Sequence, residues 1–409
     1  MGKLAINGGS PACTHRFPEW PMYDECEEKA LLEVLRSRNW WYGEKVKEFE
    51  EKFAAYQDAH FGVTTVNGTV ALQIALTAAG IGAGDEVIVP PYTFVATASA
   101  VLMVNAIPVF VDIDRDTLNI DPEAIPEAIT EKTKAIIPVH LAGYPVNMDV
   151  LWEIAREHNL KIIEDACHSW GTEYKGRKVG AIGNMGAFSF QASKNITSAE
   201  GGIILTDDEN LAELCRSYSN CGRGKDKPWY EHYLLGGNYR MTEFQAAILL
   251  CQLQRLDDQV TRRMHNAFIL DQGLAEIEGI ELLQQPPVER RSYHLYCFRY
   301  VPEKFSGVSR EKFIEALNAE GVPASQGYLF PLYRNPLFQR KGKGPRYCPL
   351  SCPYYGKEMD YSAVYCANAE QACREVVWLP QTVLLGSEEA MAEIVSAVRK
   401  VRENVNELL

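Results

Sequence analysis

The sequence predicts an α/β protein in which a large, mostly parallel β-sheet is covered by helices on both faces and is followed by a smaller α+β unit. Two observations predict this fold class. In the first two-thirds of the chain, short apolar runs alternate with amphipathic helical patterns. Later the alternation stops, and a stretch rich in Pro, Gly, Lys and Tyr intervenes. The length of 409 residues suits two domains, and we expect a large domain over 1–257, then a connecting helix and small domain over 258–409.

The large domain is predicted from its strands and helices in turn. Asp24, followed by Glu27, is typical of a capping box and starts a helix. A second helix follows Asn67-Gly68-Thr69 and ends at Gly80. Further helices are predicted over 93–104 and 148–158. The apolar runs that predict strands are 86–90, 109–111, 135–139, 161–164, 187–190 and 202–205.

One long helical pattern starts at Thr242 and continues towards Leu270, which predicts a helix joining the two domains. Beyond it the pattern is mixed, as expected of a small α+β domain. Strands are predicted over 293–301 and 322–328, helices over 309–318 and 387–409, and an extended loop over 334–365.

Composition excludes several classes of function. The net charge of −13, with no cluster of Lys and Arg, argues against a nucleic-acid or anionic-membrane partner. No apolar run is long enough to span a membrane, and the first residues lack the apolar core of a signal peptide, so we expect a cytoplasmic protein. Of the 11 cysteines only Cys348 and Cys352 lie close together, which is weak evidence for zinc. We expect free thiols in a reducing compartment and no metal site.

The segment from Ser189 to Gly202 carries the most chemical information. Lys194 lies just past an apolar strand and before a Glu-Gly-Gly turn into the next strand. A lysine that attacks a carbonyl must be neutral and partly desolvated, and the end of a buried strand provides such a place. Taken alone, Lys194 is better explained as a solvated loop lysine, and the flanking residues are what favour the chemical role.

Other candidates also follow strands or precede helices. Asp165 ends the strand 161–164, and ligands of α/β sheets bind at the carboxyl ends of strands, although such an aspartate also suits a turn or a helix cap. Gly68 and Thr69 precede a helix, where amides and a hydroxyl bind phosphate well, although most such pairs are only caps. His168 and Phe94, read alone, suit a structural histidine and a core aromatic residue.

The motif Ser189-Phe-Gln-x-x-Lys194-x-x-x-x-x-Glu-Gly-Gly202 resembles the signature of the DegT/DnrJ/EryC/StrS sugar aminotransferases, a branch of the fold-type I enzymes that use pyridoxal 5'-phosphate (PLP). The resemblance covers nearly the whole chain. It implies that Lys194 forms a Schiff base with PLP and that Asp165 contacts the ring nitrogen. The same resemblance gives His168 a place near the phenolic oxygen and Phe94 a place against the ring, with Gly68, Thr69 and Ser189 around the phosphate.

A second block, Gly236-Gly-Asn238-Tyr-Arg240-Met-Thr-Glu243, matches the family as well. There the asparagine reaches the phosphate of the neighbouring subunit, which implies a homodimer with an intersubunit active site. Arg240 is expected to hold this loop or to counter charge. Three small-domain residues are expected to border the substrate, with a structural role as the alternative; they are Tyr293, His294 and Tyr328.

Two positions depart from the family pattern. Ala199 stands where the family often has Gly, and Trp170 replaces a second histidine of the aspartate block. The added methyl group is expected to tighten the turn before Glu200, and the indole to reshape the wall behind the cofactor.

The resemblance implies an aminotransferase with ping-pong kinetics, in which L-glutamate or L-glutamine donates the amino group and a keto-sugar or keto-cyclitol accepts it. Similarity to 3-amino-5-hydroxybenzoate synthases and to scyllo-inosose aminotransferases leaves both kinds of acceptor open. A PLP-dependent sugar dehydratase is a further alternative, but that branch has histidine where this chain has Lys194. A nicotinamide-dependent dehydrogenase would need Gly-x-Gly-x-x-Gly after its first strand, and no segment fits.

Overall fold

The computed structural model describes residues 2–284, 290–342 and 347–409. Its largest sheet has seven strands in the order β1-β9-β8-β5-β4-β2-β3. All of them run in one direction except β9, which is antiparallel to both its neighbours. The strands are β1 (Phe61–Thr65), β2 (Glu86–Val89), β3 (Ile107–Phe110), β4 (Thr133–Ile136), β5 (Lys161–Asp165), β8 (Met185–Ser189) and β9 (Gly202–Thr206).

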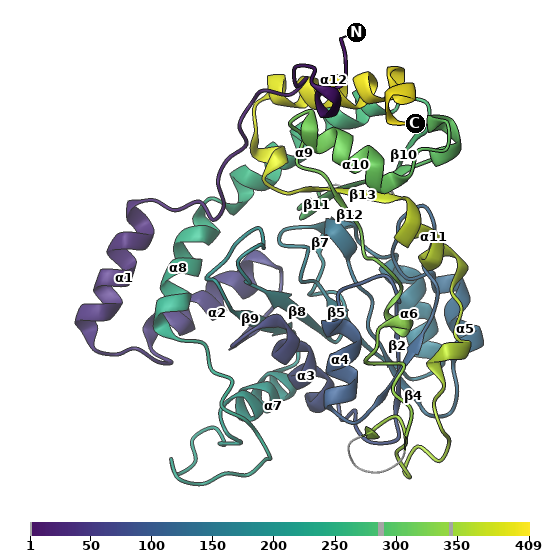
Figure 1. The fold of residues 1–409 in the computed structure, drawn as a ribbon. Helices are drawn as coiled ribbons and strands as arrows, with labels where there is room; N and C mark the ends of the chain where they lie inside the picture. The colour runs from purple at the N-terminus through teal and green to yellow at the C-terminus, as the bar shows by residue number, and fades with distance from the viewer. Residues whose placement is uncertain (1, 285–289, 343–346) are drawn as a thin grey trace.

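This sheet is buried on both faces because its side chains alternate between two apolar cores. Ile163 and Ile204 join one core, whereas their neighbours Ile162 and Ile203 join cores on the other face. The first face is covered by α3 (Gly68–Ala78), α4 (Ala96–Met103) and α7 (Glu209–Ser219). The second is covered by α2 (Glu44–Tyr56), α5 (Ile125–Ala128), α6 (Met148–Glu157) and α8 (Glu243–Gln254), and Figure 1 shows the layers.

A second, antiparallel sheet of four strands lies above the first in Figure 1, in the order β10-β11-β13-β12. The N-terminal segment also reaches this part of the chain, since the Leu4 amide donates to Glu407 and the Cys13 amide to the Glu320 carbonyl. The elements are β10 (Ile280–Leu282), β11 (Leu295–Tyr300), α10 (Arg310–Ala319), β12 (Ser325–Gln326), α11 (Ala367–Glu375), β13 (Val376–Pro380) and α12 (Glu388–Glu403). The predicted α/β architecture is confirmed.

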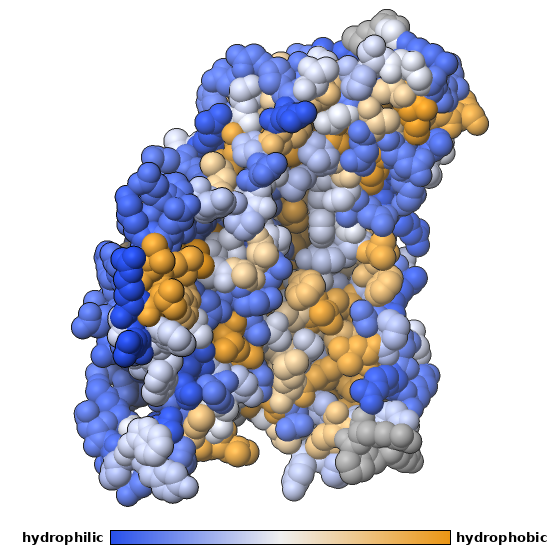
Figure 2. Space-filling view, turned by 60° about the vertical axis from the view of Figure 1, so that its left-hand side comes forward, coloured by the Kyte–Doolittle hydropathy of each residue, from blue (hydrophilic) through white to orange (hydrophobic). Residues whose placement is uncertain are grey.

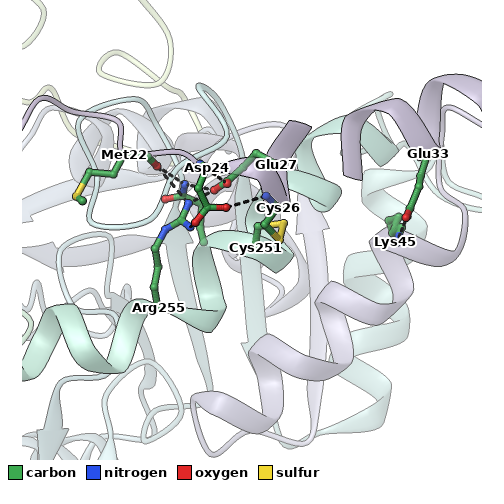
Figure 3. The surroundings of a disulfide bond; sticks show 9 residues. Met22, Asp24, Cys26, Glu27, Glu33, Lys45, Cys251 and Arg255 are labelled. Atoms are coloured by element: carbon green, nitrogen blue, oxygen red, sulfur yellow. Dashed lines mark hydrogen bonds and ion pairs between the residues drawn. A yellow bond between two sulfur atoms is a disulfide. The ribbon is translucent and has the colours of Figure 1, made fainter. Parts of the chain in front are cut away.

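The prediction of a single long helix from Thr242 is wrong. The chain forms α8, breaks at Arg255 and continues as α9 (Leu256–Leu274). The Arg255 guanidinium holds this corner: it donates to Asp24 (3.0 Å) and to the Met22 carbonyl (3.2 Å), and it pairs with Glu27 at the start of α1 (Glu25–Ser37) (Figure 3). Apolar periodicity could not reveal the break, because both helices keep an apolar face on either side of one residue.

Other predicted boundaries shift. The helix predicted over 93–104 begins only at Ala96, and the strand predicted over 322–328 shrinks to Ser325–Gln326, which pairs with β13. The last helix ends at Glu403, and a 3-10 turn follows over Val405–Leu408. Of the predicted loop over 334–365, residues 343–346 lie outside the described part of the chain.

The expectation that all the cysteines are free is also wrong. Cys26 on α1 and Cys251 on α8 form a disulfide, although 225 residues separate them in sequence (Figure 3). The sequence pattern gave no sign of this pair, because packing of α1 against α8 brings the two residues together. Within the described residues, no helix has the length and apolar character needed to cross a bilayer. The cytoplasmic location stays a prediction.

Candidate active site

One cavity of about 820 Å³ opens at the carboxyl ends of the parallel strands, between the large sheet and the small one. Ligands of open α/β sheets bind at this edge. Nine of the predicted site residues line it: Gly68, Thr69, Phe94, Asp165, His168, Ser189, Lys194, His294 and Tyr328.

The N-terminus of α3 forms one end of the cavity. The first four amides of a helix lack partners within the helix, and Asn67 accepts the amides of Val70 (2.9 Å, side chain) and Ala71 (3.1 Å, carbonyl). This leaves the amides of Gly68 and Thr69, which line the cavity with Ser189 at the end of β8. The positive end of the helix dipole and these donors suit a phosphate.

Glycine is required at position 68 by close packing. A Cβ at Gly68 would lie 2.8 Å from the Ser189 Cβ and 3.1 Å from the Cys167 sulfur. The end of β8 and the start of α3 therefore touch at Gly68.

Asp165 ends β5 with a buried carboxylate. Its Oδ2 accepts a hydrogen bond from the Thr97 hydroxyl (2.8 Å) and its Oδ1 accepts one from the Cys167 amide (3.3 Å). A carboxylate oxygen can accept more than one hydrogen bond, so Asp165 can also receive an N–H donor in the cavity.

Two histidines pack against each other in the wall, His168 and His294, with ring centroids 4.3 Å apart and ring planes tilted by 39°. The His168 Nδ1 accepts the Ala142 amide (3.3 Å), so the neutral ring carries its proton on Nε2 and can donate from there. The His294 Nδ1 lies 3.0 Å from the Asn195 oxygen, so it is the donor of that pair. Burial holds the pKa of both histidines well below the usual value, and both are neutral at physiological pH.

Lys194 lies in the turn between β8 and β9 and lines the cavity. Burial lowers the pKa of its amine, and negative charge at Cys167 and Asp165 only partly opposes this. Desolvation therefore favours the neutral amine that attack on a carbonyl requires.

Phe94 and Tyr328 border the cavity from different parts of the chain. Phe94 follows β2 and is 59% exposed, which leaves an aromatic face open at the mouth of the cavity. Tyr328 packs edge-on against Tyr92 and Trp378, with ring centroids 5.1 and 4.8 Å apart, and burial raises the pKa of its hydroxyl.

Three predicted site residues do not line the cavity: Tyr293, Asn238 and Arg240. Tyr293 is buried and packs edge-on against Tyr144. Arg240 donates to the Asn220 side chain (2.9 Å) and lies over the Trp41 ring (4.8 Å). Asn238 forms an isolated antiparallel β-bridge with Asn220 in the segment between α7 and α8.

Several residues that line or support the cavity were not predicted from the sequence. Thr97, the partner of Asp165, lay within a run of small helical residues and carried no signal of its own. Trp20, Gln191, Trp378, Gln381 and Thr382 also line the cavity. The indole of Trp20 donates to the Ala192 carbonyl (3.0 Å), two residues before Lys194. Across residues 2–284, 290–342 and 347–409, no group of three or more His, Cys, Asp or Glu side chains is placed to hold a metal ion.

Comparison with known proteins shows the family and the fold of this chain. The L-glutamine:2-deoxy-scyllo-inosose aminotransferase of Streptomyces paromomycinus is 38% identical, with 97% of each chain covered. The L-glutamine:scyllo-inosose aminotransferase of Streptomyces griseus is 37% identical, with 99% of each chain covered. The crystal structure of 3-amino-5-hydroxybenzoic acid synthase superimposes with a TM-score of 0.85 at 32% identity, covering 95% of this chain and 99% of that one. Solved structures similar to this chain are fold-type I aminotransferases, as the sequence predicts. The family model for DegT/DnrJ/EryC1/StrS aminotransferases matches residues 21–352, and the chain belongs to this family of aminotransferases.

Proposed function

We propose that this aminotransferase uses PLP, with Lys194 as the residue that binds its aldehyde. The observation that carries the proposal is that a desolvated lysine, a buried aspartate and the first residues of helix α3 line one cavity. PLP needs three matching contacts: an amine for the aldehyde, an anion for the ring nitrogen and donors for the phosphate.

The described residues fit these needs one by one. Gly68, Thr69 and Ser189 would hold the phosphate, and Asp165 would hold the protonated ring nitrogen. The His168 Nε2–H would donate to the phenolic oxygen, because its Nδ1 is already occupied by Ala142. Phe94 would cover one face of the ring, as aromatic pairs prefer.

When bound, PLP supplies an electron sink for the carbon that loses its proton. Lys194 would carry the proton: its neutral Nζ would take it from the α-carbon of the amino donor and release it to the carbon of the bound aldehyde group. In the second half of the reaction the same Nζ would move a proton in the reverse direction, to the acceptor carbon that receives the amino group. Thr97 and Cys167 both donate hydrogen bonds to the Asp165 carboxylate and so hold it in the wall of the cavity, where it would accept the ring nitrogen.

We propose that L-glutamine or L-glutamate is the donor and that a keto-cyclitol is the acceptor. Two relatives support this proposal, because both are named as L-glutamine:scyllo-inosose-type aminotransferases and the chain matches them over almost their whole length. Similarity to the 3-amino-5-hydroxybenzoic acid synthase supports a second candidate, an aminated ring that becomes aromatic. Its product would absorb in the near ultraviolet, which an aminocyclitol would not.

We propose a homodimer in which Asn238 reaches the partner's phosphate site. Figure 1 shows the chain between α7 and α8 extending away from the body of the molecule. This segment exposes large apolar side chains, with Leu235 99% exposed, and Figure 2 shows apolar groups gathered on this side of the molecule. Such exposure is typical of a surface that a partner covers. The exposed residues are Trp229, Tyr230, Tyr233 and Leu235.

We also propose the division into domains 1–257 and 258–409. The α9 helix begins at Leu256, close to this boundary, and all four strands of the second sheet lie after it. Residues 4–13 are an exception in space, because they pack against α10 and the C-terminal end.

The first test is a spectrum. Purified protein loaded with PLP is expected to be yellow and to bleach when L-glutamine or L-glutamate is added without an acceptor. A keto-cyclitol should then restore the colour. If the protein binds PLP but no added amino acid bleaches it, the proposed aminotransferase chemistry of this site is contradicted.

A further inference from the structure

Arg263, on α9, is a buried cation in the wall behind the cavity. Its side chain has no exposed surface, and within the described residues it forms no ion pair. Burial lowers its pKa to about 9, so it stays charged at neutral pH. A buried charge normally has a counter-charge. Here its partners are amide oxygens, those of Gln381 (3.1 Å from Nε and 2.5 Å from Nη2) and Gln259 (3.4 Å).

Gln381 connects this charge to the cavity. It is buried, lies directly after β13 and lines the cavity, which Arg263 does not. Because guanidinium groups only donate, the atom that faces Arg263 must be the amide oxygen. The amide nitrogen is thereby turned the other way, and it has no hydrogen-bond partner among the described residues.

A second unused donor lies nearby in sequence. The indole nitrogen of Trp378, on β13, is also buried without a partner, and Trp378 lines the same cavity. An unused buried donor costs free energy unless a ligand satisfies it. At Gln381 the wall therefore combines a positive charge with an unsatisfied donor, which suits a negatively charged acceptor.

We infer that Gln381 binds the α-carboxylate of the amino donor and that Arg263 is a positioning residue acting through it. The inference rests on the proposed function and deepens it. Charge favours the amino donor over a keto-cyclitol here, because an amino acid carries an α-carboxylate and a keto-cyclitol has no negative charge. The guanidinium polarises the Gln381 amide and fixes which of its ends faces the substrate.

The test compares two donors, L-glutamine and L-glutaminamide, in which a neutral carboxamide replaces the α-carboxylate. The bleaching rate of the PLP-loaded enzyme is measured against donor concentration. The wild-type enzyme should bind L-glutamine roughly 100-fold more tightly than the amide, as expected for a hydrogen bond to a charged group. In Gln381→Glu the apparent Kd for L-glutamine should rise by about that factor and the preference for the carboxylate should vanish, with little change in the saturating rate.

Gln259→Glu is the matched control. It places the same new charge beside the same guanidinium, but Gln259 does not line the cavity. Its preference for L-glutamine over the amide should stay within roughly three-fold of the wild-type value. Gln381→Glu is expected to fold, because the new carboxylate faces Arg263. Gln381→Met, which removes the donor without adding charge, provides a second variant and should weaken L-glutamine binding about ten-fold.

The acceptor half-reaction separates the possible outcomes. The return of colour with a keto-cyclitol should be similar in Gln381→Met and wild type. Loss of acceptor binding with normal donor binding would overturn the inference and assign Gln381 to an acceptor hydroxyl. If both Gln381 variants still prefer L-glutamine over L-glutaminamide as strongly as wild type does, the inference is overturned and the proposed function stays intact. If no amino acid bleaches the PLP-loaded wild-type enzyme, the proposed function and this inference are both contradicted.

Discussion

At the scale of single residues, the neutral amine of Lys194 is the centre of the proposed chemistry. Its low pKa is caused by burial beside His168 and His294, which are themselves neutral. A neighbouring carboxylate, Asp165, would by itself favour the charged amine, but desolvation is the larger effect. Desolvation thus favours the neutral, nucleophilic form of Lys194.

Lys194→Ala is expected to abolish transamination, with at least a 10⁴-fold loss of rate, because both proton transfers and the aldehyde contact are removed. The phosphate contacts at Gly68, Thr69 and Ser189 should still retain PLP non-covalently. The measurement is turnover together with the cofactor content after gel filtration. Wild-type turnover by this variant would refute the role of Lys194.

The two cavity histidines predict a loss of stability in acid. Both have a pKa lowered by burial, so the unfolded chain takes up their protons first as the pH falls below about 6.5. Their stabilising contribution is complete above that pH and is lost as the pH falls towards the folded-state pKa. Each contributes up to about 1.4 kcal/mol per pH unit.

His168→Gln, which keeps a polar side chain, should therefore lose less stability than wild type between pH 7.5 and 5.5. Denaturant unfolding of the PLP-free protein measures this difference. His158→Gln is the control, because His158 is exposed. Equal pH slopes for wild type and His168→Gln would contradict the assignment of a buried neutral ring.

At the scale of elements, the junction of β8 and α3 builds the phosphate end of the site. Gly68→Ala is expected to weaken PLP binding roughly ten-fold, because its Cβ would lie 2.8 Å from the Ser189 Cβ and overpacking must shift the helix start. Gly82→Ala is the matched control, with its nearest neighbour, the Val104 carbonyl oxygen, at 3.9 Å. Fluorescence titration with PLP measures both, and equal affinities would count against the tight junction.

The disulfide between α1 and α8 makes a second prediction at this scale. Reduction should lower the melting temperature of the wild-type protein, because a cross-link between residues so distant in sequence restricts the unfolded chain. Cys251→Ser should melt like the reduced protein and no longer respond to reductant. Cys348→Ser, which removes an exposed free thiol, should behave like wild type. A wild-type melting temperature that ignores reductant would show that the bond does not form.

Local sequence was enough to predict most elements, whereas the site residues were chosen through the family resemblance. The capping box at Asp24 and the strand ends at Asp165 and Ser189 depend on neighbouring residues, so the sequence could predict them. Contacts between segments far apart in the sequence could not be predicted. Neither the break at Arg255, held by α1, nor the hydrogen bond of Arg263 to Gln381 leaves a pattern in either segment.

At the scale of the whole molecule, one chain leaves the proposed phosphate site without Asn238. The cavity is lined by Gly68, Thr69 and Ser189 of the same chain, whereas Asn238 lies in the projecting segment between α7 and α8. The exposed aromatic residues around it give that segment a surface for a second copy. A symmetric dimer would exchange the two segments and complete both sites at once.

Co-expression of two inactive variants tests this exchange. Lys194→Ala and Asn238→Ala should each show little activity alone. In a mixed dimer, one site combines both defects, whereas the other receives an intact Lys194 from one chain and an intact Asn238 from its partner. Random pairing then restores about a quarter of the wild-type activity. If Asn238 served the cavity of its own chain, every site in the mixed dimer would retain one defect. The mixture would then be no more active than the average of its components, and the site would lie within a single subunit.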